Sequence, residues 1–211
     1  MSARTAPPRA SASSVSSRNR RPSREDTTGL LINKGVMAGN KVIEMAKPEA
    51  FRILFICMGN ICRSPTVEGL FRNMVKDAGL AAHVKVDSAA THNYHVGESP
   101  DPRAQAAAKK RGIDLSAIRA RQITREDFIN YDLILAMDWD NHAFLQQMAP
   151  RQYHHKIKLL MSFATEHESA VVPDPYYGGP EGFETVLDYV EDAAANLIDF
   201  VRRRMAQRAA A

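Results

Sequence analysis

FICMGNICRSP, residues 55–65, is the stretch from which the fold can be read. Its first residues continue the apolar run 51–57, which predicts a buried strand, and Ser64-Pro65 is typical of the start of a helix. A loop between a strand and a helix N-terminus points backbone N–H groups inward, and the helix dipole adds partial positive charge. The stretch therefore predicts a site for a phosphate dianion that needs no metal.

Five residues in this loop fit a nucleophilic phosphate site. Cys57 would lie beneath the bound phosphorus, and Arg63 would place a guanidinium beside the equatorial oxygens. Helix N-termini and nearby arginines stabilise thiolates, so we expect Cys57 to be the attacking thiolate. Ser64 is placed to donate a hydrogen bond to that sulfur, and Gly59 and Asn60 are residue types that tolerate left-handed backbone. The alternative is an inert buried cysteine.

Short apolar runs alternate with helical patterns from residue 51 onward, which is typical of parallel α/β sheets. We therefore expect a single α/β domain: a four-stranded parallel sheet flanked by helices, with the phosphate-binding loop between the first strand and the first helix. The expected strands are 51–56, 84–88, 131–137 and 157–161. The expected helices are 65–78, 103–111, a brief one opened by a capping box at Thr124 and Asp127, 138–148, and a last one with an apolar stripe from Phe183 to Val201.

Residues 1–48 differ in composition from the rest of the chain. They hold nine Lys or Arg and three Asp or Glu, whereas residues 49–211 hold 19 basic and 21 acidic side chains. A Ser-, Pro- and Arg-rich segment without an apolar period is typical of disorder. We therefore expect a basic, disordered segment at 1–48 and one folded domain at 49–211, which contains the phosphate-binding loop. An organelle transit peptide, or a true start at Met37 or Met45, is the alternative.

Whole-chain features exclude several classes of protein. The apolar runs are far shorter than the roughly 18 residues of a membrane span, and residues 49–211 have no basic stripe with interleaved aromatics. We therefore expect no membrane and no nucleic-acid partner. Two cysteines, Cys57 and Cys62, are too few for a secreted disulfide framework and fit a cytoplasmic location. The seven histidines form no closed ligand set, so no metal and no cofactor are expected.

The loop Cys57–Pro65 resembles the signature of the low-molecular-weight protein tyrosine phosphatases. The resemblance implies hydrolysis of phosphotyrosine, in a protein or a small aryl phosphate, through a phosphocysteine intermediate. It implies a phosphotyrosine-containing protein as substrate, with a bacterial-type tyrosine kinase among the candidates. Four further segments are similar to the family's recurring segments, in the same order: VDSAAT at 86–91, ARQI at 120–123, ILAMD at 134–138 and DPYYG at 174–178.

The resemblance also assigns roles outside the loop. Asp174, which lies between two prolines, would protonate the leaving group and then take a proton from the attacking water. Tyr176 and Tyr177 would wall the phenyl ring, and Tyr94 would border the mouth of the site. An ordinary turn and half-buried loop aromatics are the alternatives for these residues.

Support of the loop is the last role that the resemblance implies. Asn60 would fix the loop backbone, and Ser88 would bind Asn60, although a solvated strand end also explains Ser88. The family often carries a histidine where this chain has Ile118, which predicts a thinner support network. The remaining loop members and Asn60 itself are expected to contribute to phosphate binding: Met58, Gly59, Asn60, Ile61, Cys62 and Ser64.

Three competing functions fit the loop less well. Thioredoxin-coupled arsenate reductases need two further cysteines, which this chain lacks. Phosphoarginine phosphatases tend to have Thr after the loop Asn, where this chain has Ile61. A non-catalytic phosphate-binding module would not need Cys57, Arg63 and Asp174 together.

Overall fold

The computed structural model describes residues 37–38, 41–42 and 50–210. Met37–Ala38 (β1) and Lys41–Val42 (β2) pair as two short antiparallel strands in a unit of their own. The rest of the segment 1–48, for which we expect disorder, lies outside the described residues. The second unit, Lys47–Ala211, contains every predicted site residue.

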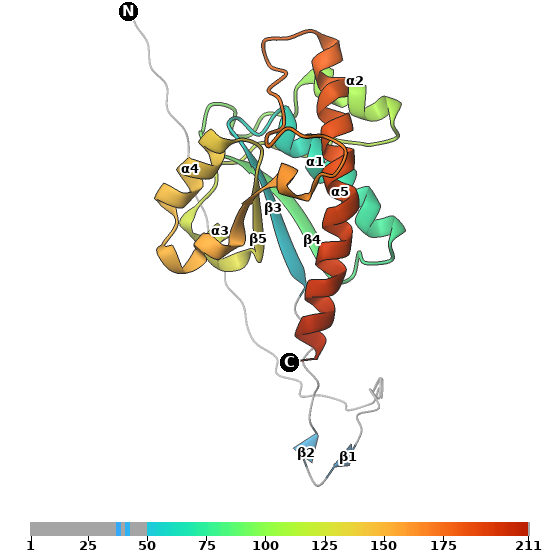
Figure 1. The fold of residues 1–211 in the computed structure, drawn as a ribbon, viewed down its shortest axis with the longest axis vertical. Coiled ribbons are helices and arrows are strands. Elements are labelled where there is room, and N and C mark those ends of the chain that lie inside the picture. Colours follow the sequence, from blue (N-terminus) through green and yellow to red (C-terminus); the bar gives the residue numbers. More distant parts are fainter. Residues whose placement is uncertain (1–36, 39–40, 43–49, 211) are drawn as a thin grey trace, which may run out of the picture. The chain divides into compact units, whose positions relative to one another are not determined.

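The second unit is built on a parallel sheet of four strands (Figure 1). The strand order is β4-β3-β5-β6, so β3, which leads into the phosphate-binding loop, is central. Ile53 on β3 pairs with Val86 on one side and with Leu133 on the other. The predicted four-stranded parallel sheet is confirmed. The strands are Phe51–Cys57 (β3), Val84–Ala90 (β4), Leu133–Ala136 (β5) and Ile157–Leu159 (β6).

Helices cover both faces of this sheet. Alternate residues of β3 point to opposite faces, so Phe55 packs edge-to-face on Phe71 of α1 while Leu54 and Ile56 belong to a second core. In Figure 1, α1 and α5 lie on one side of the sheet and α3 and α4 on the other. The helices are Arg63–Asp77 (α1), Pro102–Lys110 (α2), Arg125–Asn130 (α3), Trp139–Met148 (α4) and Pro180–Ala209 (α5).

Local signals in the sequence explain most of these boundaries. The capping box at Thr124 and Asp127 is present in both of its hydrogen bonds. Asp101 caps α2 by accepting a hydrogen bond from the backbone N–H of Arg103 at 2.8 Å. Two 3₁₀ helices, Arg151–Lys156 and Leu160–Phe163, were not predicted, because a single tight turn has no apolar period to reveal it.

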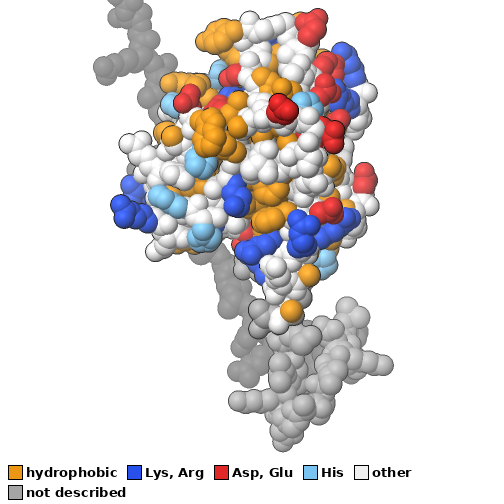
Figure 2. Space-filling view, viewed as in Figure 1, with side chains coloured by type: hydrophobic (Ala, Val, Ile, Leu, Met, Phe, Trp, Pro, Cys, Tyr) orange, Lys and Arg blue, Asp and Glu red, His pale blue; other side chains and the backbone are white. Residues whose placement is uncertain are grey.

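Charged side chains of both signs are interleaved over the face where α2 and α5 lie (Figure 2). Arg111 at the end of α2 bonds to Asp188 of α5 at 2.7 Å and to Glu191 at 3.0 Å. Within the described ranges, no helix is both long and apolar enough to cross a membrane.

Candidate active site

The loop between β3 and α1 turns sharply at Asn60. Asn60 has a φ of 57° and is the one non-glycine residue with a positive φ in the part of the chain that the structure describes. Of the two residues that tolerate left-handed backbone, only Asn60 adopts it, since Gly59 does not have a positive φ. A residue with a side chain at position 59 would crowd His95, because a Cβ at Gly59 would lie 3.0 Å from Cδ2 of His95.

The sulfur of Cys57 lies at the end of β3 and is surrounded by hydrogen-bond donors. Its Sγ atom lies 3.1 Å from Oγ of Ser64 and accepts a hydrogen bond from the backbone N–H of Asn60 at 3.2 Å. Cys57 is buried apart from its face toward the cavity. The sulfur therefore lies within hydrogen-bonding distance of two groups of the loop and faces the cavity.

Arg63 opens α1 and is held between two carboxylates. Its Nη1 donates to Asp138 at 2.6 Å and to the carbonyl of Val172 at 3.3 Å, and its Nη2 donates to Asp174 at 2.9 Å. Burial opposes the charge of Arg63, which is 3% exposed, but attraction to Cys57, Asp174 and Asp138 outweighs it and raises the pKa of the guanidinium. Arg63 is therefore a fixed cation beside the sulfur.

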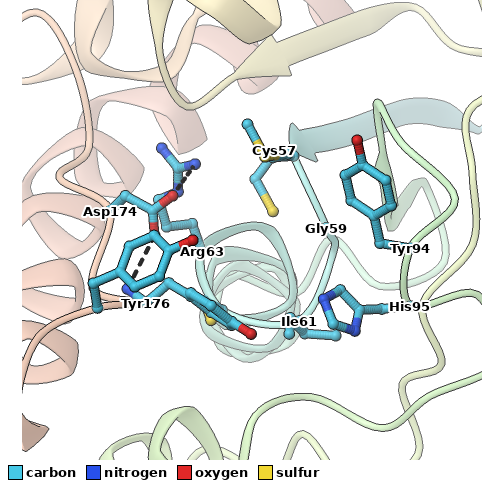
Figure 3. Close-up of a pocket in the computed structure, with 11 residues that line it drawn as sticks. Cys57, Gly59, Ile61, Arg63, Tyr94, His95, Asp174 and Tyr176 are labelled. Atoms are coloured by element: carbon cyan, nitrogen blue, oxygen red, sulfur yellow. Dashed lines mark hydrogen bonds and ion pairs between the residues drawn. The ribbon is translucent and has the colours of Figure 1, made fainter.

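These groups open onto one cavity of about 370 Å³. Figure 3 shows Asp174 and Tyr176 on one side of it, and Tyr94 and His95 on the other, with Cys57 between them. Tyr177 is 98% exposed and Tyr94 is 67% exposed, so both stand at the rim. Ten predicted residues line the cavity together with His95: Cys57, Met58, Gly59, Ile61, Cys62, Arg63, Tyr94, Asp174, Tyr176 and Tyr177.

The side chains of Asn60, Ser64 and Ser88 lie behind the loop and are not among the lining residues. Asn60 donates through Nδ2 to Ser64 at 2.9 Å and to Ser88 at 2.8 Å, and its Oδ1 accepts from the backbone N–H of Arg121 at 3.1 Å. Both side chains of the loop, Asn60 and Ser64, are buried. These hydrogen bonds support the loop, and a contribution of the two residues to phosphate binding stays a prediction.

Three neighbours of the site were missed in the sequence. Asp138 follows β5 at the carboxyl edge of the sheet, a position that could have singled it out. His95 contacts Glu98 through Nδ1 at 2.8 Å, and its proximity to the cavity depends on the loop path. Glu68 on α1 is buried and accepts a hydrogen bond from Ser88 at 2.5 Å. No sequence motif marks a single carboxylate on the face of a helix that packs against the sheet. Ile118, where the family often has a histidine, is buried and apolar.

Cys62, the second cysteine of the loop, differs from Cys57 in its surroundings. Burial, and then the negative charges of Asp101, Cys57 and Asp174, raise its pKa to about 12. Cys62 therefore remains a neutral thiol. Among the described residues, no group of three or more His, Cys, Asp and Glu side chains is arranged to hold a metal.

Comparisons with known proteins agree with this geometry. Residues 52–207 match the sequence model of the family described as low molecular weight phosphotyrosine protein phosphatase. The chain belongs to this phosphatase family. A relative in Synechocystis sp. is 49% identical over 148 residues, which cover 70% of this chain and 94% of the relative. The low molecular weight protein-tyrosine-phosphatase of Streptomyces coelicolor is 42% identical over 163 residues, covering 76% and 99%.

Solved structures of low-molecular-weight phosphatases have the same fold. The protein tyrosine phosphatase of Entamoeba histolytica superposes with a TM-score of 0.72 at 39% identity, covering 74% of this chain and 99% of that one. The expected family resemblance and fold class are thus confirmed. The matched part of this family member contains the loop 57–63 and the loop that carries Asp174.

Proposed function

We propose that the protein hydrolyses phosphotyrosine, in proteins or small aryl phosphates, through a phosphocysteine intermediate and without a metal. One observation carries the proposal. The sulfur of Cys57, with donors from Ser64 and Asn60, opens onto the same cavity as the guanidinium of Arg63 and the carboxyl of Asp174. A nucleophile, an anion-binding cation and a proton donor are the three groups that phosphomonoester cleavage requires.

In the first step, the Cys57 thiolate attacks phosphorus, and the bond between phosphorus and the phenolic oxygen breaks. The leaving oxygen takes a proton from Asp174, so that a phenol and not a phenolate departs. The backbone N–H groups of the loop and the Arg63 guanidinium hold the equatorial oxygens, on which the negative charge is spread.

The ion pair between Arg63 and Asp174 implies that substrate binding comes before the protonation of Asp174. A phosphate dianion would compete for the Nη2 hydrogen that Asp174 accepts at 2.9 Å, whereas Asp138 keeps its bond to Nη1 at 2.6 Å. Substrate binding would thus free Asp174 for protonation while Arg63 stays oriented. Asp138 serves as an anchor for Arg63.

In the second step, water attacks the phosphocysteine and releases inorganic phosphate. Asp174, now ionised, takes a proton from the attacking water, and the sulfur leaves as a thiolate. Ser64, at 3.1 Å from the sulfur, would stabilise that leaving group by donating a hydrogen bond.

The exposed tyrosines at the rim favour an aromatic substrate that protrudes from a larger protein. Tyr94 and Tyr177 offer flat faces that a phenyl ring can stack on, which supports phosphotyrosine over phosphoarginine or arsenate. A bacterial-type tyrosine kinase remains a proposed partner. A cytoplasmic location also remains a proposal, which two free cysteines support.

The test is hydrolysis of a chromogenic aryl phosphate, with phosphoarginine and arsenate assayed in parallel. Asp174→Asn should lower kcat by about 10²- to 10⁴-fold, with the smallest loss for phenols that leave without protonation. Cys57→Ser should abolish turnover.

The phosphoenzyme provides a matched control. Acid-quenched enzyme should carry covalent phosphate in wild type and in Cys62→Ser, and none in Cys57→Ser. Absence of aryl phosphate turnover in wild type, or faster turnover of phosphoarginine, would contradict the proposal.

A further inference from the structure

A chain of hydrogen bonds runs from the nucleophile through Ser64, Asn60 and Ser88 to Glu68 and Arg72 on α1. We propose that Glu68 and Arg72, which do not line the cavity, are positioning residues that keep this chain oriented to stabilise the Cys57 thiolate. The proposal rests on the proposed function, because it assigns these residues to the same reaction.

Near the sulfur, the donor and acceptor of each hydrogen bond are fixed by groups that can only donate. The backbone N–H of Arg121 can only donate, so the amide of Asn60 must present Oδ1 to it, at 3.1 Å. Both Nδ2 hydrogens then point to Ser64 and Ser88. Because Ser64 accepts from Asn60, its own hydrogen is available to donate to the sulfur of Cys57.

The far end of the chain needs a group that only accepts. Ser88 accepts a hydrogen bond from Asn60, so its single hydroxyl hydrogen must go elsewhere, and Oε2 of Glu68 receives it at 2.5 Å. An ionised carboxylate has no hydrogen to donate. A protonated Glu68 would instead donate to Ser88 and compete with Asn60 for the same oxygen.

Arg72 favours the ionised form of Glu68. Glu68 is 3% exposed and its pKa is raised on balance, chiefly by burial, whereas the hydrogen bond from Ser88 and the charge of Arg72 oppose that rise. The Nη2 atom of Arg72 contacts Oε1 of Glu68, one turn away on α1. Asp87 on β4, whose charge raises the pKa of Glu68, and Arg121, which lowers it, complete its charged surroundings.

The discriminating experiment combines Glu68→Gln with Arg72→Met. In Glu68→Gln the new amide must turn its oxygen to Arg72, which only donates, and so point its NH₂ at Ser88. This orientation competes with Asn60, and we expect aryl phosphate turnover and iodoacetate labelling of Cys57 to fall about tenfold. In the double variant the amide can turn its oxygen to Ser88, so both rates should recover to within about threefold of wild type.

The pH profile supplies an independent readout. Arg72→Met removes a positive charge that lowers the pKa of Glu68, so the acid-side loss of kcat should move to higher pH. Lys76→Met, on the next turn of α1, is the matched control and should leave the profile in place. Thermal unfolding of all variants checks that each is folded.

Two outcomes would overturn the inference. One is an active wild type with a double variant at least as impaired as Glu68→Gln, which is the result of a purely structural role. The other is an acid limb that Arg72→Met leaves unmoved. An inactive wild type would instead contradict the proposed function.

Discussion

Cys57 and Cys62 show how one loop gives two thiols different chemistry. Cys57 lies among hydrogen-bond donors beside Arg63, whereas Cys62 is buried next to Asp101 and Asp174. Since burial and carboxylates both disfavour a thiolate, the pKa of Cys62 is raised to about 12. The surroundings of each thiol therefore favour Cys57 over Cys62 as the proposed nucleophile.

The raised pKa of Cys62 predicts slow alkylation. In Cys57→Ser, iodoacetamide at pH 8 should label Cys62 far more slowly in the folded protein than in urea, as measured by mass spectrometry. Cys62 ionises near its ordinary value of 9.0 once unfolded, so its contribution to stability is complete below pH 9 and is lost as the pH rises toward 12. Equal labelling rates in the folded and unfolded states would contradict this.

At the scale of elements, the close contact of α1 with the segment after α2 depends on Gly69. A Cβ at Gly69 would lie 2.3 Å from Cδ2 of Leu115 and 2.9 Å from Cγ2 of Ile113. Both neighbours are buried, so they have little room to move. A glycine inside a helix lowers the stability of the helix, but here the absence of a side chain allows α1 to approach the segment after α2.

Gly69→Ala should therefore destabilise the protein by about 1–3 kcal/mol, because overpacking outweighs the better helix propensity of alanine. Urea unfolding followed by circular dichroism measures this. The control is Lys76→Ala on the exposed face of α1, which should change the free energy of unfolding by no more than about 0.5 kcal/mol. A more stable Gly69→Ala protein would contradict this prediction and would show that the segment after α2 can move away from α1.

Elements were predictable from the sequence where a period or a cap marks them. The capping box at Thr124 and the apolar stripe of α5 gave both helices, and Cys57 with Arg63 gave the loop. Contacts between distant segments were not predictable without a resemblance. Glu68 illustrates the limit, since Ser88, which donates a hydrogen bond to it, lies 20 residues away on β4.

At the scale of the whole molecule, the site and its core lie within one of two units. The sheet begins at Phe51, and the unit 47–211 contains every residue that lines the cavity. A chain starting at Lys47 should therefore keep kcat/KM for an aryl phosphate within about twofold and the unfolding midpoint within about 2 °C. Steady-state kinetics and calorimetry on both chains check this. A large loss of either would show that residues 1–46 contribute to the folded enzyme.

The ion pair between Arg63 and Asp174 joins residues 111 positions apart. During synthesis the loop 57–63 leaves the ribosome early, whereas Asp174 leaves it only after all four strands of the sheet. The entropy of closing so long a loop is offset only when those strands pack. Because Arg63 and Asp174 meet only in a nearly complete chain, we expect no ester cleavage by a nascent chain that ends before Asp174.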